Sequence, residues 1–164
     1  MATVDTAKIT DRRKVRYASI ADLLKDAEAL AAADRAGKLR RLGNWTLGQA
    51  FGHIGTWMSY PYDGFPMARA PWFVRLIVGL RKKKYLNEGM PAGVRIPGAK
   101  EGTYGTDVLS TEAGLAKLRA AAERLQRGER PVHPSPVFGE VSMEECTRGN
   151  LRHAELHLSF FAPA

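Results

Sequence analysis

The stretch SMEECTRGNLRHAELHLSFF, residues 142–161, contains both a helix start and two candidate metal ligands. In Ser142-Met-Glu-Glu145, the first and fourth side chains can each accept a hydrogen bond from the other residue's backbone N–H, the reciprocal pattern called a capping box. We therefore predict a helix from about residue 143 to about residue 161. His153 and His157 are four residues apart, which places them on one face of that helix, about 6 Å apart along its axis. A helix can offer two imidazoles to one metal ion at this spacing.

Three further helices are predicted from N-terminal signals and apolar spacing. Ser19 precedes a helix over 20–36, a second capping box at Thr46-Leu-Gly-Gln49 begins one over 47–60, and Ser110 precedes one over 111–127. Pro61 is expected to end the second of these, because the residue before a proline avoids helical backbone angles. Lys14–Tyr17 is the only candidate strand. These elements predict an all-α four-helix bundle, formed as a single domain over residues 1–164.

The connections between these helices are long. Residues 71–84, PWFVRLIVGLRKKK, are expected to form an extra short amphipathic helix. Such a helix either packs on the bundle with its basic end in solvent or lies on an anionic membrane surface, and we prefer the first interpretation. Residues 87–109 contain five glycines and residues 128–141 contain three prolines. Long irregular loops in a compact bundle commonly act as lids or binding loops, so both are expected to cover its histidine end.

Composition and charge limit the class of protein. The chain has 164 residues, of which 45% are apolar and 26% are charged, close to the average of soluble globular proteins. No apolar run approaches the ~20 residues that span a bilayer, and no secretory signal is recognisable near the start. The single cysteine, Cys146, cannot form an intramolecular disulfide. The net charge of +8 is dispersed, and no nucleic-acid-reading motif accompanies it. We expect a cytoplasmic protein that binds neither nucleic acid nor membrane.

A third histidine extends the candidate metal site. His53 lies on the predicted helix 47–60, which can face the last helix in a bundle. Three neutral imidazoles with an open coordination position are typical of a catalytic metal site. Amide and aromatic side chains occur on the same two helical faces, where an ordinary core would have Leu and Ile. These side chains are predicted to line the pocket: Gln49 and Trp57 beside His53, and Asn150 beside His153 and His157.

Five other residues receive structural interpretations. Gly48 and Gly52 lie inside a predicted helix, where each costs ~1 kcal/mol relative to alanine, so close approach of a neighbouring helix is expected there. Glu155 lies ~200° around the helix from His153, which argues against a zinc protease and for a surface or supporting position. Cys146 is expected to be a buried, inert thiol, and His133 an exposed loop residue.

Four stretches of the sequence together resemble the DinB-like superfamily, and more narrowly a bacterial branch known only as a domain of unknown function. They are Gly43-Asn-Trp-Thr-Leu-Gly-Gln-Ala-Phe-Gly-His53, Asp63-Gly-Phe-Pro66, Ser135-Pro-Val-Phe-Gly139 and Leu151-Arg-His-Ala-Glu-Leu-His-Leu-Ser-Phe160. The resemblance extends from about residue 12 to residue 161. It implies a DinB/YfiT-like four-helix bundle, often a homodimer, with a divalent-metal site at His53, His153 and His157. The branch commonly has His-Ala-Glu-His-His near its end, where this chain has Leu156, ~100° from the ligand face.

The resemblance also suggests a function. Characterised members of the superfamily include metal-dependent transferases that use bacillithiol, mycothiol or glutathione, and a thiol-dependent maleylpyruvate isomerase. The leading hypothesis is a metal-dependent enzyme acting on a small molecule, either a thiol S-transferase for small electrophiles or a hydrolase. The metal would be zinc, nickel or iron, since imidazole suits each of them. The alternative is a non-catalytic metal-binding or small-ligand-binding protein of a stress response. No carboxylate can be assigned to the ligand face, and a hydrolase usually needs one as a base.

Overall fold

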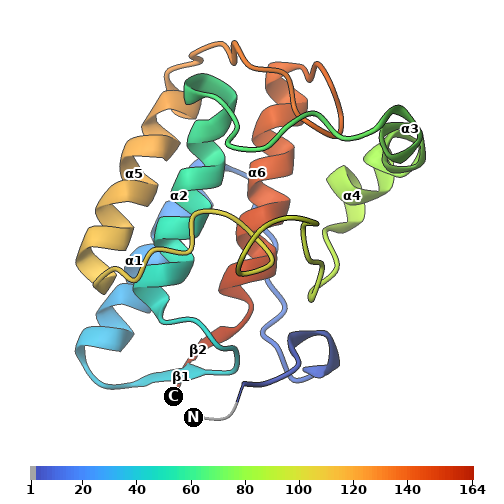
Figure 1. Cartoon of the computed structure of the whole chain (residues 1–164). Coiled ribbons are helices and arrows are strands. Elements are labelled where there is room, and N and C mark those ends of the chain that lie inside the picture. Colours follow the sequence, from blue (N-terminus) through green and yellow to red (C-terminus); the bar gives the residue numbers. More distant parts are fainter. Residues whose placement is uncertain (1–2) are drawn as a thin grey trace.

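Four long helices form the body of the protein, a computed structural model of which describes residues 3–164 (Figure 1). The helices are α1 (Ile20–Arg35), α2 (Leu47–Asp63), α5 (Thr111–Gln126) and α6 (Met143–Leu158), and a short 3₁₀ helix, Thr6–Lys8, precedes them. In Figure 1, α2 lies between α5 and α6, and α1 lies behind them. The prediction of a mainly helical fold is confirmed.

The long helices begin at their predicted caps and share one apolar core. Ser19, Thr46 and Ser142 each form the reciprocal hydrogen bonds of a capping box. Each helix contributes fully buried side chains to the core, among them Leu23, Leu30, Phe51, Ile54, Leu115, Leu118 and Leu158. Burial of one such side chain stabilises a fold by about 1.5–3 kcal/mol. The four helices therefore share one continuous apolar core.

The predicted end of α2 is wrong. The helix continues through Pro61 to Asp63 and is capped by Gly64, whose φ of +100° is readily adopted only by glycine. A proline this close to the end of a helix removes a single N–H donor from the last turn. The carbonyl oxygen of Pro61 accepts hydrogen bonds of 2.9 Å from the backbone N–H groups of Val132 and His133, which fix the end of the helix to a loop.

A two-stranded antiparallel sheet was not predicted. Strand β1 (Leu39–Arg41) pairs with β2 (Phe161–Pro163), and Arg41 lies opposite Phe161. The predicted end of α6 at about residue 161 is therefore wrong, because the helix stops at Leu158 and the buried Phe161 begins the strand.

The predicted strand at Lys14–Tyr17 is also wrong. Its backbone is bonded by side chains of α6 instead of a partner strand. The N–H of Tyr17 donates to Oε1 of Glu155 over 2.7 Å, and the carbonyl of Tyr17 accepts from Nη2 of Arg152, also over 2.7 Å. The N-terminal segment is thus fixed along α6.

The predicted extra helix consists of two helices. Helix α3 (Trp72–Leu80) and helix α4 (Lys82–Glu88) are separated at Arg81. Leu86 of α4 is buried, and α4 lies against α6. No residue of α3 is fully buried, and Val74, Arg75 and Val78 are partly buried, so α3 packs on the protein through one side only.

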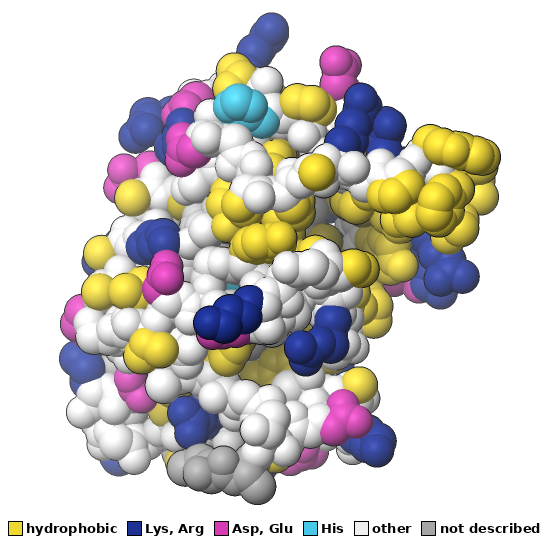
Figure 2. All heavy atoms as spheres, in the orientation of Figure 1, with side chains coloured by type: hydrophobic (Ala, Val, Ile, Leu, Met, Phe, Trp, Pro, Cys, Tyr) yellow, Lys and Arg dark blue, Asp and Glu magenta, His cyan; other side chains and the backbone are white. Residues whose placement is uncertain are grey.

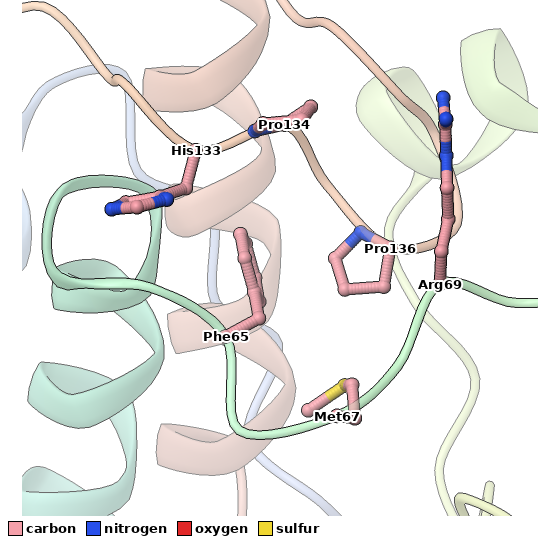
Figure 3. A pocket seen from close by; sticks show the side chains of 6 residues that line it. All are labelled: Phe65, Met67, Arg69, His133, Pro134 and Pro136. Atoms are coloured by element: carbon pink, nitrogen blue, oxygen red, sulfur yellow. The ribbon is translucent and has the colours of Figure 1, made fainter.

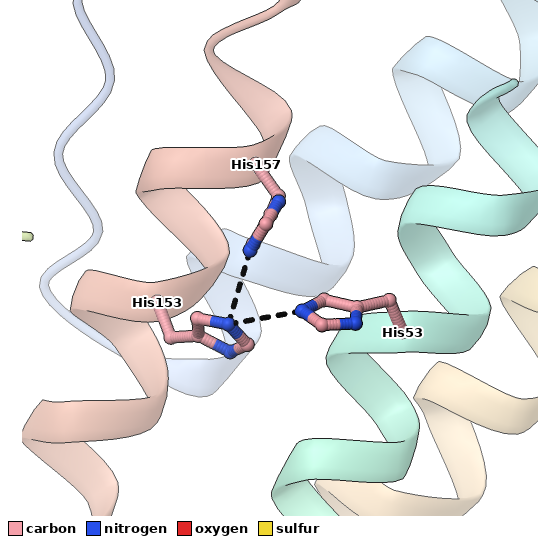
Figure 4. Close-up of side chains that lie close together, drawn as sticks. All are labelled: His53, His153 and His157. Atoms are coloured by element: carbon pink, nitrogen blue, oxygen red, sulfur yellow. Dashed lines mark hydrogen bonds between the residues drawn. The ribbon is translucent and has the colours of Figure 1, made fainter. Parts of the chain in front are cut away.

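Glycines allow α2 and α5 to approach closely, as predicted. A Cβ on Gly48 would lie 2.2 Å from the carbonyl oxygen of Leu109, at the start of α5, and one on Gly114 would lie 2.3 Å from the carbonyl oxygen of Gly48. A Cβ on Gly52 would lie 2.7 Å from a side-chain carbon of Leu109. This contact fixes α2 against α5 on one side, and His53 projects from another side of α2 toward α6 (Figure 4).

Candidate metal centre

The three predicted ligand histidines converge on one point between α2 and α6. His53 comes from α2, and His153 and His157 come from successive turns of α6 (Figure 4). The Nε2 atom of His153 lies 3.2 Å from Nε2 of His53 and 3.0 Å from Nε2 of His157. All three ligand atoms lie within 4.8 Å of one another. The predicted convergence of the imidazoles is confirmed.

These separations are similar to those that a shared metal ion requires. Zinc–nitrogen bonds of about 2.0–2.1 Å in tetrahedral geometry place neighbouring nitrogen atoms about 3.3 Å apart. The two shorter separations at the centre, 3.2 Å and 3.0 Å, are close to that value.

A backbone carbonyl determines which nitrogen of His53 faces the centre. Nδ1 of His53 lies 2.9 Å from the carbonyl oxygen of Tyr104. A carbonyl oxygen can only accept, so in the neutral ring Nδ1 carries the proton and Nε2 has a free lone pair. Metal-binding histidines are commonly oriented by such a bond from the second nitrogen. The carbonyl of Tyr104 therefore holds His53 with its Nε2 lone pair directed at the centre.

The surroundings keep all three imidazoles uncharged at neutral pH. Burial lowers the pKa of His53 to about 4, although hydrogen bonds with the backbone at Tyr104 and Gly105 raise it in part. Burial lowers the pKa of both His153 and His157 well below the ordinary value; the next cause is the proximity of His53 for His153, and the proximity of His153 and then His53 for His157. Neutral imidazole is the form that binds a metal ion.

Two tryptophans form apolar walls around the histidines. The Trp45 ring stacks on His157 with a centroid separation of 5.1 Å and lies 4.7 Å from His53. The Trp57 ring lies 5.6 Å from His153 and 6.0 Å from His53. His53 is buried, whereas both histidines of α6 retain partial solvent exposure. The centre is thus enclosed by rings but open to solvent on the α6 side.

The two amides predicted to line the pocket already have hydrogen-bond partners. Oε1 of Gln49 accepts from the Thr46 N–H within the capping box, and Nε2 of Gln49 donates to the carbonyl of Thr106 over 3.3 Å. Nδ2 of Asn150 donates to the carbonyl of Cys146 over 3.0 Å. Gln49 therefore supports the loop beside the centre, and Asn150 is bonded within its own helix.

Cys146, His133 and Glu155 lie outside the three-histidine cluster. Cys146 is buried, and burial raises the pKa of its thiol, as expected for an inert cysteine. His133 is exposed on its loop, also as predicted. Glu155 is a buried supporting residue: besides accepting from Tyr17, it pairs with Arg152 over 2.8 Å.

Of the two loops expected to cover the histidines, the first does so. Residues 104–106 of the first loop lie against α2, where Tyr104 also accepts a 3.1 Å hydrogen bond from Nε1 of Trp57. A Cβ on Gly105 would lie 2.8 Å from the Thr56 side chain, so the loop touches the helix directly.

The expectation is wrong for the second loop, residues 128–141. It is anchored to Pro61 at the far end of α2, because the carbonyl groups of that last turn need N–H donors. Together with residues that follow α2, it forms an open pocket of about 190 Å³ (Figure 3). The pocket residues are Phe65, Met67, Arg69, His133, Pro134 and Pro136.

Sequence reasoning did not assign Trp45 or Tyr104 to the site. Trp45 immediately precedes the helix cap Thr46, a position where an apolar side chain often packs on the first turns, and this could have drawn attention to it. Tyr104 acts through its backbone carbonyl, which every residue possesses. No sequence signal identifies it.

The fold and the centre together define a mainly helical protein with a three-histidine cluster between two of its long helices. The chain belongs to the family described as "Protein of unknown function (DUF1569)", whose sequence model matches residues 9–164. No curated protein and no solved structure matches it.

Proposed function

We propose that this protein is a metal-dependent enzyme of the DinB-like type that transfers the sulfur of a small cellular thiol to a small electrophile. The observation that carries the proposal is the convergence of three imidazole Nε2 atoms, two pairs of which are 3.2 Å and 3.0 Å apart. The DinB-like assignment is supported by the position of these histidines on the second and fourth long helices, α2 and α6.

The donor set fits a divalent cation. Three neutral nitrogen donors suit zinc, nickel or iron, and they leave at least one coordination position for another molecule. Nδ1 of His53 keeps the proton of that ring for Tyr104, so Nε2 of His53 faces the other two imidazoles with a lone pair and no proton. Without a cation, the three clustered nitrogen atoms would therefore have too few protons for each of them to form a hydrogen bond of its own. His53, His153 and His157 would hold the cation, which would supply the Lewis acidity that lowers the pKa of a thiol or of water at the site.

The remaining residues favour a thiol over water as the nucleophile. Among residues 3–164, the cluster includes no carboxylate that could act as a base for hydrolysis. In the proposed transfer, the thiol loses its proton to solvent, its sulfur forms a bond to the electrophilic carbon, and the leaving group departs with its electron pair. Trp45 and Trp57 would exclude water and provide an apolar wall for the electrophile.

Metal analysis and a conjugation assay test this proposal together. Protein purified without a histidine tag should contain close to one equivalent of a divalent metal. It should conjugate bacillithiol, mycothiol or glutathione to a chromogenic electrophile in the presence of zinc, nickel or manganese. The His153→Ala variant should lose both metal and activity and keep its helical circular dichroism. Conjugation that persists in this variant would refute the mechanism. Metal binding without conjugation of any of these thiols would instead indicate a non-catalytic metal-binding protein.

A further inference from the structure

Helix α3 presents an apolar face that nothing in the described chain covers. Its exposed side chains are 52–80% accessible to solvent: Trp72, Phe73, Leu76, Ile77 and Leu80. At 100° per residue they occupy an arc of about 140° on the helix. Val74 and Val78 lie on the opposite side and are partly buried, so the exposed arc is the outward face of the helix. Exposed apolar surface this concentrated marks an interaction site.

The surroundings of this face are strongly basic. Between residues 64 and 87 the sequence has six lysines and arginines and no acidic residue. Arg69, Arg81 and Lys83 are exposed, Lys84 is exposed and lies 3.7 Å from the Glu88 carboxylate, and Lys82 is paired with Glu145 over 2.7 Å. Figure 2 shows the apolar cluster at the tip of a projecting lobe, with Lys and Arg side chains next to it.

We propose that α3 docks the protein onto an anionic lipid surface, with its apolar side chains entering the interface and the adjacent cations contacting the headgroups. Such an interface suits this helix, because its apolar face carries tryptophan and phenylalanine and has lysine and arginine beside it. This inference does not depend on the metal centre.

Charge and shape favour a membrane over a second copy of this chain. A symmetric contact through α3 would bring the same cations of both copies together, which repels. The face is also convex, because α3 stands away from the four long helices (Figure 1). A protein partner would need a groove to enclose it, whereas a fluid lipid surface accommodates a projecting helix. No described helix is long and apolar enough to cross a bilayer, so the proposed contact lies at the surface.

Vesicle co-sedimentation of the full chain tests the proposal. The protein should bind vesicles of phosphatidylcholine mixed with phosphatidylserine, bind pure phosphatidylcholine much more weakly, and dissociate as salt is added. The double variant Leu76→Glu/Ile77→Glu should abolish binding. As a matched control, Val108→Glu/Val132→Glu places two charges at valines that are 81% and 70% exposed elsewhere, and it should bind like the unmodified protein.

A second pair of variants separates local charge from net charge. Replacing Arg81, Lys83 and Lys84 with glutamine should weaken binding about 100-fold, since each cation near an anionic surface contributes about fivefold. Replacing Lys25, Lys38 and Lys100 with glutamine lowers the net charge equally and should have a much smaller effect. All six residues are exposed, so circular dichroism should be unchanged in both variants.

Three outcomes would overturn the proposal. The first is failure of the full chain to bind anionic vesicles. The second is equal loss of binding in the two triple variants. The third is a dimer in solution that binds no vesicles and dissociates in Leu76→Glu/Ile77→Glu, because the face would then be covered by a second copy of the chain.

Discussion

Replacing Gly105 with alanine should weaken metal binding although the residue does not touch the metal ligands. The new Cβ would lie 2.8 Å and 2.9 Å from Cγ2 and Cβ of Thr56, so the loop must move away from α2. That movement would draw the carbonyl of Tyr104, the adjacent residue, away from Nδ1 of His53. Loss of such a supporting bond typically lowers metal affinity 10–100-fold, which corresponds to about 1.4–2.8 kcal/mol.

Gly98→Ala is the matched control for this prediction. Gly98 lies in the same loop and has a φ of +83°, close to the +71° of Gly105, but a Cβ there would meet nothing within 4 Å. Both variants therefore carry the same cost of about 1 kcal/mol for a left-handed alanine, and only Gly105→Ala should change the affinity for the metal. Zinc competition against a chromogenic chelator measures the difference. Equal affinities in the two variants would refute the supporting role of Tyr104.

Three further predictions follow from the centre and the core. His153→Ala should lower zinc affinity at least 100-fold, whereas His133→Ala, in an exposed loop, should leave chelator competition unchanged. The folded pKa of His53 is about 4, so as the pH falls from about 6.5 to about 4 this imidazole takes up a proton in the unfolded chain but not in the folded protein. Urea titrations of the metal-free protein should therefore show that the free energy of unfolding decreases over this range. His53 contributes up to about 1.4 kcal/mol per pH unit to this decrease, and nothing above pH 6.5. Gly48→Ala would place a Cβ 2.2 Å from a backbone oxygen and should lower the free energy of unfolding by at least about 2 kcal/mol; Gly79→Ala, in the open helix α3, should change it by less than about 1 kcal/mol.

Local sequence signals predicted the helices and the pairing of two of the three clustered histidines, because the responsible interactions span only a few residues. The capping boxes at Thr46 and Ser142 join residues three positions apart, and His153 and His157 share a helical face through their spacing alone. The place of His53 opposite them depended on assembly of the helices. A bundle allows the helix over 47–60 to face the last helix, and the resemblance to a known superfamily implied the same position for His53.

Long-range contacts account for what the sequence did not predict. The strand at Phe161 exists because a segment 120 residues earlier in the chain, at Arg41, pairs with it. The amphipathic pattern of α3 shows that the helix has an apolar face, but not whether the protein itself covers that face. The second loop is placed by the hydrogen bonds that Val132 and His133 donate to the carbonyl of Pro61, and the glycines and prolines of the loop do not specify that anchor.

The carbonyl of Tyr104 accepts N–H groups from both His53 and Trp57, and this connects the centre to the loop above it. Thermodynamic linkage makes such a connection reciprocal. If a bound cation raises the equilibrium constant for ordering residues 104–106 by some factor, the ordered loop raises the affinity for the cation by the same factor. A substrate that displaced the loop would loosen the cation equally. Amide hydrogen exchange at residues 104–106, followed during a zinc titration, would measure that coupling directly.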